Sequence, residues 1–99
     1  MDSNRFKGTV ILTEAAMRAL NEKPLSKVEG MVLWHLVATL PVAGAVVSNA
    51  DLGEILAITR TRMSQTMKLL CEIGFLLRGS KMGVSYHYKL NPAFIRVLS

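Results

Sequence analysis

The sequence contains one cysteine and no grouping of residues that suggests a metal site. Cys71 has no second cysteine with which to form an internal disulfide, and the two histidines, His35 and His87, are far apart in the chain. A structural zinc site needs four Cys or His ligands at characteristic spacings. We therefore expect no metal and no cofactor, and the single cysteine is typical of a reducing cytoplasm.

The patterns by which many enzymes are recognised are also missing. The sequence has no paired carboxylates, no nucleophile elbow and no glycine-rich phosphate loop. Acid–base, nucleophilic and phosphoryl-transfer chemistry each require such a grouping. We expect the protein not to be an enzyme.

Long hydrophobic runs are absent as well. The longest, residues 31–40, is interrupted by His35 and Thr39, whereas a helix that crosses a bilayer needs about 20 apolar residues. Residues 1–7 lack the apolar centre of a secretion signal. We expect no membrane association and a cytoplasmic location.

Acidic residues are scarce in one part of the chain. Residues 59–89 contain a single acid, Glu72, and the basic residues Arg60, Arg62, Lys68, Arg78, Lys81 and Lys89. This segment therefore carries the whole formal net charge of +5, because the other residues contain equal numbers of basic and acidic side chains. Such a concentration of positive charge favours binding to a polyanion such as a nucleic acid.

The chain is 99 residues long and 51% of its residues are hydrophobic. This length suits a single domain, residues 1–99, with one core. The hydrophobic fraction is high for so small a domain, so we expect part of the apolar surface to be covered by a second copy in a homodimer. The candidate interface residues are Met17, Leu20, Trp34, Phe94, Ile95 and Val97.

Four helices are predicted from capping residues followed by apolar residues at helical spacing. Thr13 begins the first, which stops at residues 21–24, and Ser26 with Glu29 forms a capping box for the second, which ends before Pro41. Ser48 begins a short third helix and Thr59 a fourth that runs to residue 73. The predicted inward positions of these two helices are Leu52, Ile55, Leu56, Met63, Met67 and Leu70.

Extended segments are predicted at residues 9–12 and 46–47, and two strands at 75–78 and 84–90 around a turn at 79–83. In the second of these strands Val84, Tyr86, Tyr88 and Leu90 alternate with polar residues, which predicts that they share one face. Asn91 and Pro92 predict a last helical turn that includes residues 94–97. The predicted fold class is mainly α with a small β-sheet, a three-helix core followed by a β-hairpin.

Residues 49–76 carry a more specific pattern. An acidic and polar helix is followed by Ala57-Ile58 in the turn, by a second helix that starts Thr59-Arg60-Thr61-Arg62, and by Gly74 with two apolar residues after it. This pattern resembles the helix-turn-helix of MarR-like and related bacterial regulators. The resemblance covers residues 25–90 and implies a winged helix-turn-helix, with the helix-turn-helix at about 48–74 and the wing at about 75–90.

The family resemblance implies binding to double-stranded DNA by a small bacterial, plasmid or phage transcriptional regulator, associated with the nucleoid. The chain lacks the long flanking helices with which MarR-like proteins dimerise and build a ligand pocket, so no small-molecule effector is expected. A shorter motif, Tyr88-Lys89-Leu90-Asn91-Pro92-Ala93-Phe94, is similar to the end of the winged-helix core in RepL-type plasmid replication proteins. The alternatives are therefore a replication protein that binds origin DNA and a winged helix that docks on other proteins.

Helix geometry then assigns DNA-contacting residues. Residues on the side of the fourth helix opposite its apolar positions reach base edges in the major groove, and Arg62 suits guanine while Gln65 suits adenine. The predicted base contacts are Thr61, Arg62, Gln65 and Lys68. The predicted DNA backbone contacts are Ser48, Asn49, Thr59, Arg60 and Ser64, and the predicted wing contacts are Arg78, Ser80 and Lys81.

Overall fold

The computed structural model describes residues 9–98, which form an α+β fold with four helices and two small antiparallel sheets. Residues 1–7, for which the sequence predicts no secretion signal, lie outside this range. In chain order the elements are β1 (Thr9–Leu12), α1 (Glu14–Glu22), α2 (Lys27–Thr39), β2 (Ala45–Val47), α3 (Asn49–Leu56), α4 (Arg60–Ile73), β3 (Leu76–Met82), β4 (Ser85–Leu90) and β5 (Ile95–Leu98).

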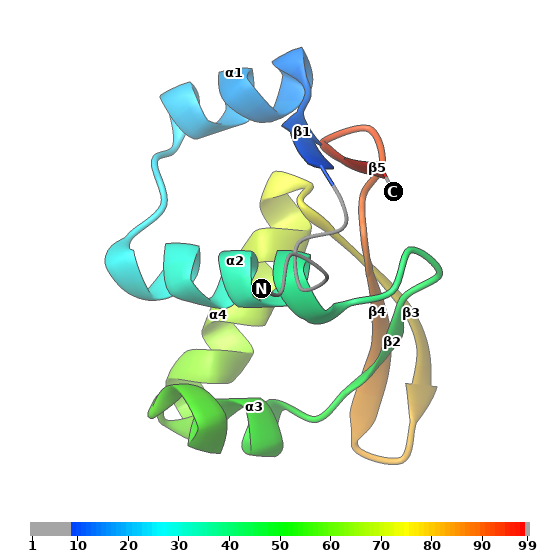
Figure 1. The fold of residues 1–99 in the computed structure, drawn as a ribbon. Helices are drawn as coiled ribbons and strands as arrows, with labels where there is room; N and C mark the ends of the chain where they lie inside the picture. The colour runs from blue at the N-terminus through cyan, green and yellow to red at the C-terminus, as the bar shows by residue number, and fades with distance from the viewer. Residues whose placement is uncertain (1–8, 99) are drawn as a thin grey trace, which may run out of the picture.

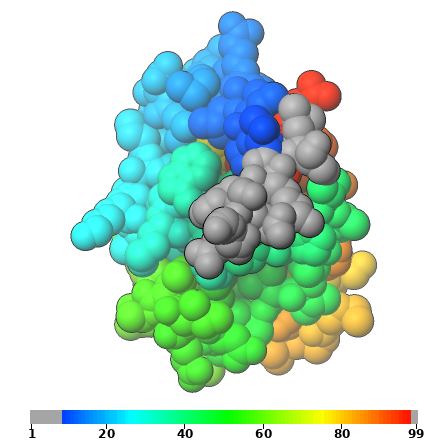
Figure 2. All heavy atoms as spheres, viewed as in Figure 1, coloured from blue at the N-terminus to red at the C-terminus, as the bar shows by residue number. Residues whose placement is uncertain are grey.

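The helices cross one another beside a three-stranded sheet (Figure 1). In this view α2 passes in front of α4, α3 lies below both, and the sheet of strand order β2-β4-β3 stands at the side. A second sheet, β1 with β5, lies at the opposite end from α3. The space-filling view places the blue residues of β1 and α1 at one end of the molecule and the green and orange residues of α3, the start of α4 and the β3–β4 hairpin at the other (Figure 2).

The predicted helix starts are confirmed, because each capping side chain bonds the first turn. The hydroxyl oxygens of Thr13, Ser26, Ser48 and Thr59 accept hydrogen bonds from backbone amides three residues later. At Ser26 the capping box is complete, since the Glu29 carboxylate accepts from the Ser26 amide at 2.9 Å. The first turns are thus fixed by local bonds that a sequence reveals.

The core lies where α2 and α4 meet the sheet. Fully buried side chains come from α2, α4 and the start of β3, and the largest are Phe75, Leu33, Leu36, Met63, Met67, Leu70, Leu76 and Val32. The three predicted inward residues of α4 are among them, which confirms that prediction. Burying each large apolar side chain in this way stabilises the folded state by about 1.5 to 3 kcal/mol.

The α3–α4 turn corrects the prediction for Ile55. Its side chain is 68% exposed, while the buried residues of α3 are Leu52 and Gly53. The Ile58 amide donates to the Gly53 carbonyl at 2.8 Å, and a Cβ on Gly53 would lie 2.6 Å from the Ile58 carbonyl oxygen. The chain therefore folds back over Gly53, and Ile55 is left on the outer side.

The hairpin turn also differs from its prediction. It consists of Gly83 and Val84, not of residues 79–83, because Met82 already pairs with Ser85. Gly83 has a φ of 66°, a conformation that favours glycine, and Val84 is 96% exposed instead of sharing the buried face of β4. Gly79 lies in a β-bulge, where β3 has one residue more than its partner between Arg78 and Lys81.

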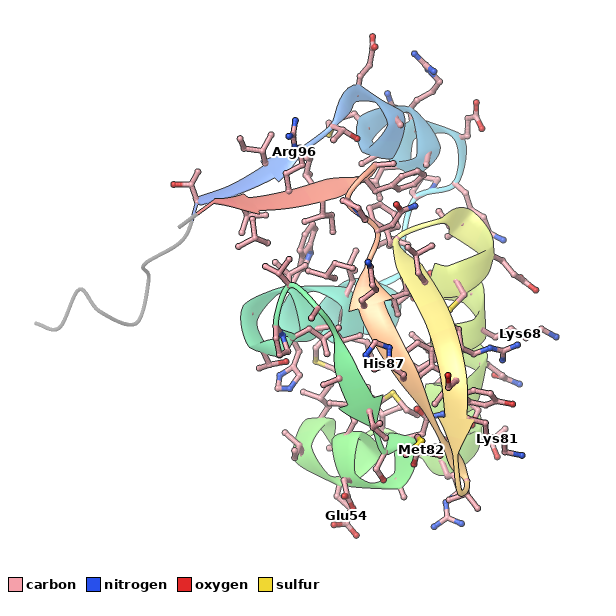
Figure 3. The ribbon with its side chains drawn as sticks, turned by 90° about the vertical axis from the view of Figure 1, so that its right-hand side faces the viewer. Glu54, Lys68, Lys81, Met82, His87 and Arg96 are labelled. Atoms are coloured by element: carbon pink, nitrogen blue, oxygen red, sulfur yellow. The ribbon has the colours of Figure 1, made fainter. Side chains whose placement is uncertain are left out.

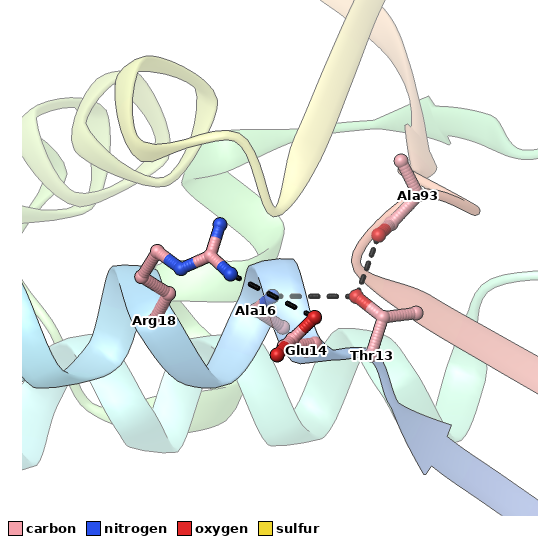
Figure 4. Close-up of polar contacts among 5 residues, drawn as sticks. All are labelled: Thr13, Glu14, Ala16, Arg18 and Ala93. Carbon is pink, nitrogen blue, oxygen red and sulfur yellow. Dashed lines mark hydrogen bonds and ion pairs between the residues drawn. The ribbon is translucent and has the colours of Figure 1, made fainter.

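The C-terminal residues form a strand instead of the predicted last helical turn. The turn starts as predicted, with the amides of Phe94 and Ile95 donating to the Asn91 carbonyl, both at 2.9 Å. It ends because Thr13 occupies the acceptors that a longer helix would use. The Thr13 hydroxyl donates to the Ala93 carbonyl at 2.6 Å (Figure 4). The Thr13 backbone amide donates to the Phe94 carbonyl at 2.9 Å. Residues 95–98 then pair with β1.

Candidate nucleic-acid interface

One long side of α4 is exposed along its whole length. With Met63, Thr66, Met67 and Leu70 buried, the 3.6-residue period places the opposite line of the helix at Thr61, Gln65, Lys68 and Glu72, all of which are exposed. Three of the four predicted base contacts therefore share one line. The fourth, Arg62, is exposed on the flank of α4, where it borders a hollow of about 310 Å³ together with Glu29 of α2.

The predicted DNA backbone contacts lie around the starts of α3 and α4. Thr59, Arg60 and Ser64 are exposed, while Ser48 and Asn49 are half-buried. The hydroxyl oxygens of Ser48 and Thr59 accept from the first turns of their own helices, at 3.2 Å in both cases. Their O–H groups remain to donate outward. The buried Oδ1 atom of Asn49 has no hydrogen-bond partner among residues 9–98.

A groove of about 610 Å³ separates α4 from the β3–β4 hairpin. Its lining residues come from both elements and from the start of α3, and they include Asn49, Ser64, Lys68, Arg78, Ser85 and Tyr86. Figure 3 shows the Lys68 and Lys81 side chains extending to the same side of the molecule, one from α4 and one from β3. The groove thus brings predicted contacts from separate segments of the sequence to one surface.

Tyr86 holds two of the hairpin cations. The Arg78 guanidinium carbon lies 4.5 Å from the centre of the Tyr86 ring, and Lys81 Nζ lies 5.9 Å from it. A cation over an aromatic face is attracted by the ring quadrupole, by about 0.5 to 1 kcal/mol at exposed sites. The sequence placed Tyr86 on one face of its strand with Tyr88 and Leu90 and missed this role, because the bulge that brings Lys81 opposite Tyr86 was not predicted. Ser80 lies in the same bulge and is exposed.

The cations of this surface have no carboxylate partner among residues 9–98. The one ion pair of these residues joins Glu14 to Arg18 on α1, at 3.7 Å (Figure 4). These positive charges therefore lie together at the surface of α4 and the hairpin without an ion-pair partner in this part of the chain. Their combined field attracts a polyanion.

Glu72 is the one acid on the exposed line of α4, and we expect Glu72→Gln to strengthen binding to duplex DNA by about threefold to tenfold. Removing a negative charge next to Lys68 reduces repulsion of the phosphates, and glutamine keeps the shape and helix propensity of the side chain. Fluorescence anisotropy at low salt measures the change. Glu22→Gln, at the far end on α1, is the matched control and should leave affinity unchanged; equal effects of the two variants would contradict a DNA-facing α4.

Burial raises the pKa of two groups behind the groove. The Cys71 thiol has its pKa raised chiefly by desolvation, a shift that Arg78 opposes and Glu72 reinforces. Desolvation is also the main cause of the raised pKa of Tyr88. Cys71 is therefore a protonated, half-buried thiol at neutral pH.

These shifts predict a loss of stability in alkaline solution. Below the ordinary thiol pKa of 9.0 both groups are protonated in the folded and unfolded chains. As pH rises above it, the unfolded chain loses its protons first, so the free energy of unfolding falls until the folded groups also ionise. Urea unfolding at pH 7 and pH 10 should show a smaller pH dependence for Cys71→Ala than for wild type. Identical pH dependences would contradict the assignment.

The six predicted dimer residues do not form one exposed surface. Ile95 is 2% exposed and belongs to the core, which overturns its assignment to an interface. Leu20 and Phe94 are partly buried against the same core, and the Phe94 ring packs edge-on against Phe75 at 5.1 Å. Met17, Trp34 and Val97 are 46%, 45% and 38% exposed. These three lie on different elements, α1, α2 and β5.

Comparison of the chain with protein-family models, with curated proteins and with solved structures found no match in any of the three. Within residues 9–98, no helix combines the length and apolar character needed to cross a bilayer. In the same part of the chain, no three His, Cys, Asp or Glu side chains gather as a metal site would require.

Proposed function

We propose that the protein is a winged helix-turn-helix module that binds double-stranded DNA, with α3 and α4 as the helix-turn-helix and the β3–β4 hairpin as the wing. The observation that carries the proposal is the groove between α4 and the hairpin, which has cations on both walls and no ion pair among them in residues 9–98. A nucleic-acid backbone is the polyanion whose regular charge spacing suits such a surface.

In this arrangement α4 enters the major groove by its N-terminal half. Thr61, Gln65 and Lys68 face the base edges, and Arg62 reaches them from the flank of the helix. Arg60 and the free amides at the start of α4 bind phosphates, as helix N-termini do. Glu72 limits the contact to the first two to three turns, since a carboxylate there repels the backbone.

The hairpin binds the DNA beside the major groove. Arg78 and Lys81 are held over Tyr86, so the entropy lost when they contact a phosphate is smaller than for free side chains. Ser80, exposed in the bulge, adds a hydroxyl donor. The hairpin and α4 together fix the orientation of the module on the duplex.

The biological role that we propose is transcriptional regulation in a bacterium, plasmid or phage. A replication protein that binds origin DNA would use the same interface. The residues of the motif shared with RepL-type proteins have structural roles here: the Asn91 side-chain Nδ2 donates to the Gly74 carbonyl at 2.8 Å, and Phe94 packs on Phe75. That motif therefore favours neither role over the other.

Salt-dependent binding to duplex DNA tests the proposal. If the three cations assigned to phosphates, Arg60, Arg78 and Lys81, each neutralise one, the slope of log affinity against log salt should be about −3. A slope near zero, or no binding at about 0.05 M salt, would exclude DNA binding and favour docking on a protein. Selection of bound duplexes from a random pool then gives the DNA sequence that the protein recognises. Sites with this sequence at a promoter would indicate a regulator, and repeated sites at an origin would indicate a replication protein.

A further inference from the structure

The β1–β5 ribbon is a two-stranded sheet, and one edge of β1, called the unused edge below, has no other strand of residues 9–98 beside it. Within residues 9–98 β1 pairs with β5 alone. Leu12 and Ile95 anchor one end of the ribbon in the core, whereas Val10, Ile11 and Val97 are 44%, 42% and 38% exposed. A two-stranded sheet is marginally stable in water unless further strands or packing support it.

The pattern of hydrogen bonds between β1 and β5 determines which backbone groups of β1 face the unused edge. The Thr13 amide donates to the Phe94 carbonyl, one step beyond the Leu12–Ile95 pair. Alternate residues of an antiparallel strand direct both backbone groups to the same neighbour. The backbone N–H and C=O groups of Thr13 and Ile11 therefore face β5. Those of Val10 and Leu12 face the unused edge.

The β1 edge carries none of the features that normally prevent pairing. Its residues, Thr9-Val10-Ile11-Leu12, include no charge, no proline and no bulge, and three of the four are strongly β-forming. The other strand of the ribbon has Arg96, which is exposed. A further strand can therefore pair with the edge of β1, whereas the charge of Arg96 disfavours pairing at the edge of β5.

We propose that β1 pairs with β1 of a second copy of this chain, antiparallel about a two-fold axis at Ile11. In this register Val10 exchanges backbone hydrogen bonds with Leu12 of the second copy, and Ile11 lies opposite Ile11 of the second copy as a non-hydrogen-bonded pair. The result is a four-stranded sheet of order β5-β1-β1-β5. Because the same edge is used on both chains, assembly stops at two.

Charge distribution supports a second copy as the occupant. The start of α4 and the tip of the hairpin lie at the end of the molecule opposite the ribbon, as the positions of Met82 and Arg96 in Figure 3 show. Among the basic side chains of segment 59–89, Lys89 is the exception, since it lines a hollow together with Arg96. Residues outside that segment carry balanced charges. Pairing through β1 keeps the two basic surfaces apart, whereas pairing near α4 would bring them together.

The two copies of Arg96, the one charged residue of the ribbon, are also well separated. Arg96 pairs with Ile11, so the two copies of Arg96 lie three strand spacings apart, about 14 Å. That distance exceeds the Debye length of about 8 Å at physiological salt. Electrostatic repulsion therefore does not oppose the pairing, and two exposed isoleucine side chains are buried against each other.

This dimer does not depend on the proposed function, and it is measured without DNA. In a Cys71→Ser background, Ile11→Cys should form a disulfide-linked dimer under mild oxidation. The Cα atoms of a non-hydrogen-bonded pair are about 4.5 Å apart, within the range that a disulfide spans. Val97→Cys is the matched control, since its side chain is similarly exposed but lies more than about 14 Å from its copy.

The expected result is at least a tenfold faster cross-linking of Ile11→Cys than of Val97→Cys, with circular dichroism unchanged from wild type. Equal rates, or none for either, would overturn the proposal. Sedimentation of the wild-type chain provides a test without the cysteine variants: mass should rise from monomer to dimer as concentration increases to about 1 mM, and Val10→Lys should abolish the rise. A monomer at all concentrations would also overturn it, whatever the DNA-binding result.

Discussion

Replacing Arg60, Arg62 and Lys68 by alanine should weaken binding to duplex DNA by about a hundredfold at roughly 0.15 M salt. In the proposed complex Arg62 and Lys68 contact base edges, and each such contact contributes about 1 to 3 kcal/mol of discrimination. Arg60 contacts a phosphate, so its loss lowers the slope of log affinity against log salt by about 0.9. All three side chains are exposed and form no ion pair within residues 9–98. Alanine favours the helix, so α4 should remain folded.

A second triple variant separates local contacts from net charge. Replacing Arg18, Lys23 and Lys27 by alanine lowers the formal charge from +5 by the same three units, on α1, its C-terminal cap and the start of α2. We expect less than a threefold change in affinity and nearly the same salt slope. Anisotropy titrations at four or more salt concentrations measure both. If the two triple variants lost affinity equally, binding would follow net charge and α4 would not be the contact helix.

Helix positions were predictable from the sequence because they depend on local interactions. Ser26 and Glu29 bond each other's backbone across three residues, and Gly74 takes the left-handed φ of 116° that ends α4. The exposed line of residues on α4 followed as well, since the buried methionines fix the rotation of the helix. Capping, termination and periodicity need no information from distant residues.

The features that were mispredicted depend on partners far away in the chain. Residues 95–98 form a strand because Thr13, about 80 residues earlier, binds the carbonyls of residues 93 and 94. Ile55 is exposed because the tight turn places Gly53 against the following segment. The bulge at Gly79 and the Tyr86 site follow from the pairing register of β3 and β4. Periodicity within one segment contains no information on such contacts.

Phe75→Ala should lower the free energy of unfolding by about 3 to 5 kcal/mol, the largest stability effect that we predict for a single substitution. The Phe75 side chain is completely buried and meets the Phe94 ring edge-on, with 5.1 Å between centres. Truncation leaves a cavity that α4 and β3 fill incompletely. Since a domain of this size has a total stability of about 5 to 15 kcal/mol, the variant should be partly unfolded at 37 °C.

Leu77→Ala is the control. Because Leu77 is 42% exposed, this substitution should lower the free energy of unfolding by less than about 1 kcal/mol. Urea unfolding monitored by circular dichroism measures both variants, and a loss below about 1 kcal/mol for Phe75→Ala would contradict the packing described. Phe75 lies between the end of α4 and the start of β3 in the hairpin. Its backbone carbonyl accepts a hydrogen bond from the Asn91 backbone amide at 2.9 Å. The two walls of the basic groove and the turn into β5 therefore meet at this residue, so the proposed DNA-binding surface depends on its packing although Phe75 itself touches no ligand.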